Sequence, residues 1–243
     1  MTDCKLGRER GLAVRIFADG ADLQDILESA ADSSIAGFTT NPTLMRAAGV
    51  TNYKQFAASV IEAAGGRPVS FEVLADDFGE MERQAVEIAS WGTNVNVKIP
   101  ITNTSGKSAV PLVAELAAQG VVCNVTAMFG MQQVNEILEV LPSGAEIILS
   151  IFAGRIADTG VDPVPIMRQA VEATRSQPDV AILWASPREV LNIFQANELG
   201  VDIITCTRDL RVKMPIIGKD LGTYSRETVQ MFFSDAEAAG YTL

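Results

Sequence analysis

The sequence predicts an α/β protein, a single (β/α)8 TIM barrel with an extra C-terminal helix. Strand-like and helix-like segments alternate eight times along the 243 residues, with short connections between them. Parallel strands joined by helices form a sheet that the helices cover, and eight such units make one barrel of about this length. No linker or change in composition divides the chain, so we expect one domain over residues 1–243. Residues 1–11 would be a loose lead-in, and residues 225–243 the C-terminal helix and tail.

A doubly wound open sheet is the alternative for a chain of alternating strands and helices. Such a sheet more often carries a glycine-rich turn after its first strand, where a dinucleotide binds. The corresponding turn here is Asp19-Gly20-Ala21-Asp22, which lacks that pattern. The barrel is therefore the preferred prediction.

The strands are predicted from short apolar runs that are bounded by polar or turn-forming residues. The fourth is the clearest, because valine and isoleucine alternate with other residues along it and Pro100 lies near its end. In chain order we expect strands over residues 14–18, 37–40, 68–74, 94–101, 121–126, 145–152, 180–185 and 201–206.

Helices are predicted where apolar residues recur at helical spacing or where a capping residue opens a segment. Asp77 is such a cap. Thr104 or Ser105 would cap the helix after the fourth strand, and Ser225 or Thr228 the last one. In chain order we expect helices over residues 21–32, 52–64, 77–91 and 104–119, from about 130, over 162–175 and 187–199, a short one from 207, and over 225–240.

Composition excludes several classes of function. The net charge of −11 leaves no basic surface for nucleic acid, and no apolar run is long enough to span a bilayer. The absence of histidine excludes a Ser-His-Asp triad and a His-ligated metal site. Cys4, Cys123 and Cys206 have no paired spacing, which indicates a reducing compartment, and residues 1–11 are too polar for a secretory signal. We therefore expect a cytoplasmic protein with no nucleic-acid or membrane partner.

Lys98 lies inside the fourth predicted strand, between Val97 and Ile99. An ammonium in an apolar strand is unfavourable unless it is paired or has lost its proton. A desolvated lysine with a lowered pKa is a nucleophile that can form a Schiff base with a ketone. The alternative is a lysine at the strand edge that extends into solvent, which is the usual case for a lysine in a strand.

In a barrel enzyme the active site lies at the carboxyl ends of the strands. Polar side chains occur at or near that end of each predicted strand, in the order Asp19; Thr39, Thr40 and Asn41; Glu72; Lys98; Asn124 and Thr126; Ser150 and Arg155; Ser186 and Arg188; Thr205 and Thr207. Each has an ordinary explanation by itself, such as a helix cap, a turn or a surface arginine. Together they suit addition of an amine to a ketone, proton removal by a carboxylate so that a C–C bond breaks, and binding of a dianion by two arginines.

Seven short motifs follow one another on the predicted strands. They are Ile16-Phe17-Ala18-Asp19, Gly37-Phe38-Thr39-Thr40-Asn41-Pro42, Phe71-Glu72-Val73, Val97-Lys98-Ile99-Pro100, Asn124-Val125-Thr126, Leu149-Ser150-Ile151-Phe152-Ala153-Gly154-Arg155-Ile156 and Ala185-Ser186-Pro187-Arg188. In this order they resemble the transaldolase family, and the resemblance extends from about residue 15 to the end, which looks like the tail of its short members. It implies a class I aldolase-type barrel with the Schiff-base lysine on the fourth strand. We expect no cofactor and no metal ion.

By this resemblance Lys98 forms the imine with the ketose donor, and Asp19 takes the proton of the C4 hydroxyl and later returns it. Glu72 and Thr126 would hold the water used to form and hydrolyse the carbinolamine. The remaining residues assigned to substrate binding are Asn41, Asn124 and Ser150 for the hydroxyls, Phe152 for the pocket wall, Arg155, Ser186 and Arg188 for the terminal phosphate, and Thr40, which precedes Asn41.

Two positions separate activities within this family. Transaldolases are similar to this chain in having Glu72, whereas fructose 6-phosphate aldolases carry glutamine there and tyrosine in place of Phe152. Both residues imply transfer of a dihydroxyacetone unit from fructose 6-phosphate or sedoheptulose 7-phosphate to erythrose 4-phosphate or glyceraldehyde 3-phosphate.

Two departures from the family are Gly20-Ala21, where small hydroxyl residues are frequent, and Pro187 in the anion loop, where an aromatic residue is frequent. A sulfonated sugar is therefore an alternative substrate, and release of free dihydroxyacetone an alternative reaction.

Two other interpretations are open. Residues 104–108 end like a P-loop, but the glycine needed five positions before Gly106 is Ile101, so we expect a capped helix start there. A sugar-phosphate-binding barrel without catalysis would need the two arginines but not Lys98. We expect sugar phosphates as ligands and a homo-oligomer, with the final helix packed on its own barrel or on a neighbour.

Overall fold

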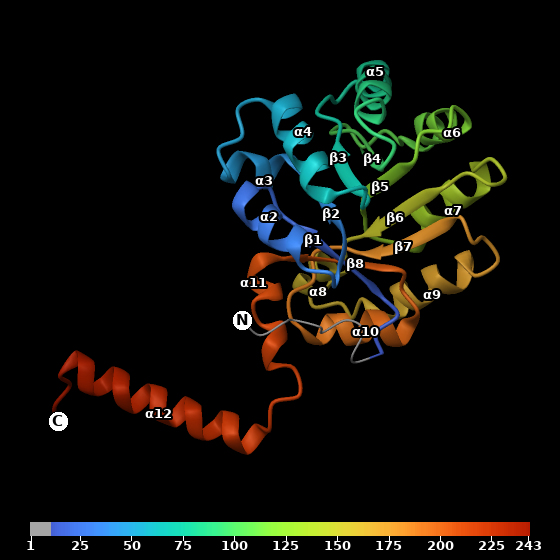
Figure 1. Cartoon of the computed structure of the whole chain (residues 1–243). Coiled ribbons are helices and arrows are strands. Elements are labelled where there is room, and N and C mark those ends of the chain that lie inside the picture. Colours follow the sequence, from blue (N-terminus) through green and yellow to red (C-terminus); the bar gives the residue numbers. More distant parts are fainter. Residues whose placement is uncertain (1–10) are drawn as a thin grey trace.

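The fold is a closed barrel of eight parallel strands. A computed structural model describes residues 11–243, so the expected lead-in lies outside the described residues except for Gly11. The strands follow one another around the barrel in sequence order, and β1 also pairs with β8. Figure 1 shows the helices arranged around the outside of the strands. The predicted (β/α)8 barrel is confirmed.

The strands coincide closely with the predicted segments. They are β1 (Arg15–Asp19), β2 (Ile35–Thr39), β3 (Val69–Glu72), β4 (Val95–Pro100), β5 (Cys123–Met128), β6 (Ile147–Ile151), β7 (Val180–Trp184) and β8 (Ile203–Thr207). Most of their residues are apolar because side chains fill one face of each strand inside the barrel and helices cover the other.

Inside the barrel, an apolar layer lies below a polar one. Phe17, Ile148, Leu183 and Ile203 form a buried cluster, and the Phe17 ring lies so close to Gly37 that a Cβ there would come within 2.6 Å of it. Side chains alternate along a strand, so the residues two positions later point inward as well. The polar side chains at the carboxyl ends of the strands thus lie directly on this buried apolar cluster.

Twelve helical segments cover the barrel or follow it in the described residues. They are α2 (Leu23–Ala31), α3 (Pro42–Ala47), α4 (Tyr53–Ala64), α5 (Phe78–Ala89), α6 (Val110–Ala118), α7 (Met131–Val140), α8 (Ala153–Asp158), α9 (Val164–Thr174), α10 (Leu191–Leu199), α11 (Arg208–Arg211), the 3-10 helix η1 (Met214–Ile216) and α12 (Leu221–Ala239). The short helices α3 and α8 were not expected, because six residues carry too little periodicity to predict a helix.

Three helices, α6, α10 and α12, begin four or more residues away from their predicted starts, whereas the start of α5 agrees with its prediction. Asp77 caps α5 as expected, by accepting from the Glu80 amide at 3.1 Å. The last helix begins at Leu221 rather than at 225, because Asp220 caps it by accepting from the Thr223 amide at 2.8 Å. The helix expected from 187 begins at Leu191.

The helix expected from residue 104 begins only at Val110. Residues 101–109 form a loop instead, in which the Asn103 side chain accepts from the amides of Ser105 and Lys107 at 3.2 and 2.9 Å. The prediction of a capped helix start at Thr104 or Ser105 was therefore wrong. These amides are occupied by Asn103, which is a different arrangement from a phosphate-binding loop.

Helix α12 projects away from the barrel (Figure 1). None of its residues is buried, although Leu221, Tyr224 and Phe232, at spacings of three and eight residues, share one face of it. No helix within residues 11–243 is both long enough and apolar enough to cross a membrane.

Candidate active site

The register of β3 and β4 places Glu72 beside Lys98. The Lys98 Nζ lies 3.0 Å from Glu72 Oε2 and donates to the Thr40 carbonyl oxygen at 2.9 Å. Both side chains are enclosed, with 7% of the lysine and 16% of the glutamate exposed. The buried amine is therefore paired with a carboxylate and does not extend into solvent. A carboxylate at hydrogen-bond distance can exchange a proton with the amine directly.

Asp19 ends β1 and lies inside the same polar layer. Its Oδ1 accepts from the Thr39 hydroxyl at 2.7 Å, and the Thr39 hydroxyl in turn contacts that of Thr205. Burial raises the pKa of the Asp19 carboxyl above its usual range, while the positive charge of Lys98 and the Thr39 hydrogen bond act in the opposite direction. Asp19 is thus poised to exchange a proton nearer to neutral pH than an ordinary aspartate.

A cavity of about 160 Å³ opens at this end of the barrel. Its lining includes ten residues to which the sequence analysis had assigned a role: Asp19, Asn41, Lys98, Asn124, Thr126, Ser150, Phe152, Arg155, Ser186 and Arg188. Glu72 and Thr40 lie next to the amine without lining the cavity. Residues from almost every strand end thus converge on one small space, as in other barrel enzymes.

Hydrogen bonds fix the orientation of the amide side chains around the cavity. Asn124 donates to Ser70 Oγ at 3.0 Å and accepts from Ser150 Oγ at 2.7 Å. Asn41 caps α3 by accepting from the Leu44 amide at 3.0 Å, which leaves its amide nitrogen as the donor for a ligand.

Two hydroxyls near the amine have no hydrogen-bond partner within residues 11–243. They belong to Thr40 and Thr126, and both are buried. Buried hydroxyls normally find a partner, so an unpaired one in a cavity wall points to a water molecule or a ligand group. Of the two, Thr126 lines the cavity.

Two arginines also line the cavity, Arg155 of α8 and Arg188 in the loop after β7. Arg188 makes two hydrogen bonds with the Asp158 carboxylate, Nε to Oδ1 at 3.0 Å and Nη2 to Oδ2. The Arg155 guanidinium lies over the Phe152 ring, 5.2 Å from its centre. Both guanidiniums retain further N–H groups for an anion.

The loop after β7 is pressed against α8. Ser186 has a φ of 59°, a left-handed conformation that is uncommon for a residue other than glycine. A Cβ on Gly154 would lie 1.5 Å from the Ser186 carbonyl oxygen, so only glycine fits there. Such strained backbone often marks a functional site.

The sequence analysis did not assign roles to several residues that build this site. Thr39 and Thr205 were noted at strand ends, and the period of two along a strand could have shown that they face inward with Asp19. Tyr53 donates to the Glu72 carbonyl and accepts from its amide, both at 2.9 Å. No local pattern pointed to Tyr53 or Asp158, because each meets its partner only through the packing of helices on the barrel.

Other reactive groups in the described residues lie outside the site. Cys123 and Cys206 are buried free thiols, and burial raises the pKa of each to about 12, so neither is a ready nucleophile. Within residues 11–243, no cluster of three Cys, Asp or Glu side chains is arranged to hold a metal ion.

Comparison with known proteins places this arrangement in a family. Residues 16–242 match the family described as Transaldolase/Fructose-6-phosphate aldolase. A probable transaldolase from Roseiflexus sp. (strain RS-1) is 36% identical over 194 residues, which span 79% of this chain and 85% of that protein. A probable transaldolase from Dehalococcoides mccartyi is 32% identical over 202 residues, with 83% and 90% covered.

Solved structures share the architecture at low identity. A dihydrodipicolinate synthase from Rhodopseudomonas palustris is similar with a TM-score of 0.57 at 14% identity, over 92% of this chain and 80% of that chain. A mandelate oxidase mutant reaches a TM-score of 0.53 at the same identity, with 85% and 67% covered. At these identities the likeness concerns the fold alone.

Proposed function

Because the chain belongs to the transaldolase/fructose-6-phosphate aldolase family and is an enzyme of the transaldolase type, we propose that it transfers a dihydroxyacetone unit from a ketose phosphate to an aldehyde through a Schiff base on Lys98. The observation that carries this proposal is the Lys98 amine, enclosed in a small cavity and 3.0 Å from the Glu72 carboxylate. An amine held in this way can lose its proton to the neighbouring carboxylate and then attack a ketone.

The first half of the reaction forms the imine. The neutral Lys98 amine adds to the ketone carbon of the donor, and loss of water from the resulting carbinolamine gives an iminium. Glu72 takes the proton from the amine and returns one to the departing hydroxyl, and Thr126 holds that water; the unpaired Thr126 hydroxyl supports this role.

The second half breaks and remakes a C–C bond. Asp19 takes the proton of the donor's C4 hydroxyl, the C3–C4 bond breaks, and its electrons pass into the iminium to give an enamine while the aldehyde leaves. The enamine then attacks the carbonyl carbon of the acceptor, and Asp19 returns its proton to the new hydroxyl. Hydrolysis of the iminium releases the product and restores Lys98.

The rest of the cavity wall suits a polyhydroxylated anion. Asn41, Asn124 and Ser150 offer oriented amide and hydroxyl groups to the three-carbon unit, Thr40 supports the amine through its carbonyl, and Phe152 provides an apolar wall. Substrate hydroxyls bind well to such preorganised polar groups. The terminal anion would be held by Ser186, Arg155 and Arg188, with Asp158 keeping the Arg188 guanidinium in place.

Transfer rather than simple cleavage is proposed because Glu72 is a carboxylate. Next to the covalent intermediate, this carboxylate controls the proton and the water on which hydrolysis depends. The enamine then persists until an acceptor arrives. Release of free dihydroxyacetone is the alternative outcome of the same chemistry.

A panel of donors and acceptors with product detection by mass spectrometry tests this proposal. Donors would be fructose 6-phosphate, sedoheptulose 7-phosphate and a sulfonated ketose, each with erythrose 4-phosphate, glyceraldehyde 3-phosphate or no acceptor. We expect a three-carbon unit to move from a phosphorylated donor to an acceptor, and little donor to be consumed when no acceptor is present.

Two lysine variants serve as controls for the panel. Lys98→Met should abolish transfer, whereas Lys54→Met, which removes a side chain that is 73% exposed, should not change it. Equal consumption of donor with and without an acceptor would show an aldolase instead. Undiminished transfer by Lys98→Met would refute the proposed nucleophile.

Self-association through α12 is a separate proposal about partners. We propose that a second copy of the chain covers the apolar face of this helix. Residues 221, 224, 228, 232, 236 and 239 recur at helical spacing on that face, yet no residue of α12 is buried. A solvated helix of this kind gains most of its stability from tertiary packing, so an uncovered apolar face favours association.

Light scattering of the full chain tests this association. We expect a mass above that of one chain, a lower mass for Phe232→Glu on the apolar face, and no change for Gln230→Glu on the opposite face. A wild-type chain that remains monomeric at the concentrations used for activity would contradict it.

A further inference from the structure

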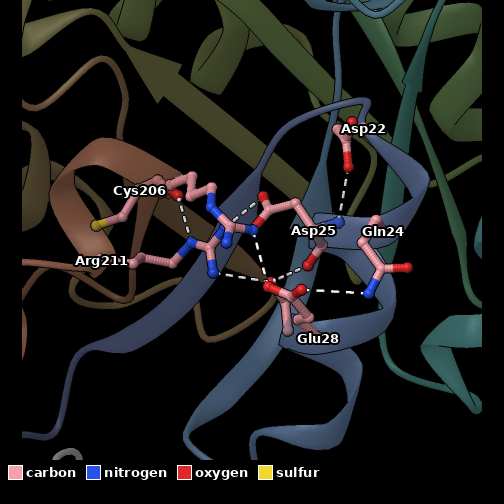
Figure 2. A network of polar contacts seen from close by, with 8 residues as sticks. Asp22, Gln24, Asp25, Glu28, Cys206 and Arg211 are labelled. Carbon is pink, nitrogen blue, oxygen red and sulfur yellow. Dashed lines mark hydrogen bonds and ion pairs between the residues drawn. The ribbon is translucent and has the colours of Figure 1, made fainter.

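A network of two arginines and two carboxylates joins α11 to α2, the helix that follows β1 (Figure 2). The buried Asp25 of α2 accepts from Arg211 at its Oδ2, at 2.6 Å, and from Arg208 at its Oδ1, at 2.8 Å. Arg208 also donates to Glu28 Oε2 at 2.8 Å. The two arginines differ in their surroundings, because 13% of the Arg211 side chain is exposed against 51% of the Arg208 side chain.

Arg211 connects β8, the strand that pairs with β1, to α2, the helix that follows β1. Its Nε donates to the Cys206 carbonyl oxygen on β8 at 3.2 Å, and its Nη1 contacts Ser29 Oγ on α2 at 2.7 Å. Figure 2 shows the guanidinium reaching from α11 towards Asp25 on α2. In the barrel, Cys206 pairs with Ala18, the residue before Asp19.

The same network reaches the turn on the other side of Asp19. The Asp25 oxygen that Arg211 holds lies 3.4 Å from the position that a Cβ on Gly20 would occupy. Gly20 follows Asp19 directly, and its amide donates to the Thr39 carbonyl oxygen at 3.1 Å. Arg211 thus binds the carbonyl of Cys206, which lies beside the chain before Asp19, and the carboxylate of Asp25, which lies close to Gly20 after it.

We propose that Arg211 is a positioning residue for Asp19, because it locks the turn after β1 between α2 and β8 and so fixes where the Asp19 carboxylate points. The inference rests on the proposed function, in which Asp19 exchanges the proton of the reacting hydroxyl. Arg211 does not line the catalytic cavity, so it acts through this turn and not by touching substrate.

The charge of Arg211 supports the same role. The ionisable groups that act on Asp19 are Lys98 of β4, Glu72 of β3, Cys206 of β8 and Arg211 of α11. Burial raises the pKa of Asp19, and the negative charge of Glu72 raises it further. The positive charge of Lys98 and, more weakly, that of Arg211 lower the same pKa. When Lys98 becomes a neutral enamine nitrogen, Arg211 is the cation of this set that still favours the ionised carboxylate.

The pH dependence of kcat in Arg211→Gln tests the proposal, with Arg208→Gln as the matched control. Both substitutions remove a guanidinium from the Asp25 carboxylate, but Arg208 is half-exposed and bonds to Asp25 and Glu28, whereas Arg211 also bonds to β8 and lowers the pKa of Asp19. The acid limb of kcat reports groups of the enzyme–substrate complex. In Arg211→Gln we expect this limb to move up by about half a pH unit. The plateau of kcat should fall several-fold with KM unchanged, whereas Arg208→Gln should resemble the wild type.

Arg211→Lys separates the charge from the geometry. A lysine keeps the positive charge but cannot bridge Asp25, Ser29 and the Cys206 carbonyl at once. We expect its acid limb to stay near that of the wild type while its plateau falls as in Arg211→Gln. A limb displaced as far as in Arg211→Gln would contradict the role of the charge.

A double variant keeps the proposal testable if Arg211→Gln does not fold. Asp25→Asn with Arg211→Gln replaces the buried ion pair by two neutral amides. Because an anion is removed together with the cation, we expect the acid limb to move less than in Arg211→Gln, while the plateau of kcat falls as far with KM unchanged. An acid limb of Arg211→Gln equal to that of Arg208→Gln would overturn the proposal, even if the melting temperature falls. If Arg211→Gln does not fold, a plateau of the double variant equal to that of Arg208→Gln would overturn it. Absence of transfer activity in the wild-type enzyme would instead refute the proposed function.

Discussion

Removing the Thr39 hydroxyl should shift the pH range in which the enzyme works. This hydroxyl donates to Asp19 Oδ1 at 2.7 Å, and its own oxygen is left to accept from Thr205. Thr39→Val preserves the shape of the side chain and removes the donor. A hydrogen bond to a charged group contributes about 1.5–3 kcal/mol, which corresponds to about 1–2 pH units in the pKa of the acceptor. The lower end applies here, because the Thr205 hydroxyl can partly take over.

The sign follows from the proposed role of Asp19. As a base the carboxylate must be ionised, so activity is lost as the pH falls through its pKa. Burial already raises that pKa, and loss of the Thr39 donor raises it further. We expect the acid limb of kcat in Thr39→Val to lie about one pH unit above that of the wild type.

Steady-state kinetics between mildly acidic and alkaline pH measure this shift, with Thr39→Ser as the control that keeps the hydroxyl. Thr39→Ser should retain the wild-type limb. An acid limb in Thr39→Val that coincides with the wild-type limb would refute the assignment of Asp19 as the group that titrates. A fall in kcat at every pH, without displacement of the limb, would show that Thr39 only supports packing.

Three further substitutions test other parts of the site. Glu72→Gln should lower kcat by about 10²–10⁴-fold and raise the share of free dihydroxyacetone among the products, and an unchanged product ratio would count against Glu72 as the group that favours transfer. Arg188→Ala should raise KM about tenfold or more for fructose 6-phosphate but little for fructose, and equal effects on both would remove it from the anion site. Gly154→Ala should lower the free energy of unfolding in urea by about 1–3 kcal/mol, because its Cβ would collide with the Ser186 carbonyl, and a wild-type midpoint would contradict that contact.

The barrel could be predicted from the sequence because its strands are apolar runs at regular intervals. Strands buried on both faces need such runs, so all eight overlap the predicted segments. Helix starts were predicted less well. Val110 begins α6 because a turn built on the Asn103 side chain intervenes, and Asp220 caps α12 ahead of the residues that had been expected to do so.

The composition of the candidate site followed largely from its place at the strand ends, but its pairings did not. The Lys98–Glu72 pair depends on the register of β3 and β4, which barrel closure sets and no local pattern shows. The pairing of Arg188 with Asp158 depends on the packing of α8 against the loop after β7. Tertiary contacts of this kind decide which charged groups form ion pairs. A list of strand-end residues therefore predicts which residues belong to a site but not which of them bind one another.

Capture of the covalent intermediate tests the proposed chemistry most directly. The full chain would be mixed with fructose 6-phosphate, reduced with borohydride and digested, and its peptides would be mapped by mass spectrometry. We predict a reduced three-carbon group on the peptide that contains Lys98, and none when Lys98→Met is treated in the same way. A three-carbon adduct on a different lysine, or an equal adduct on the Lys98→Met chain, would contradict the account.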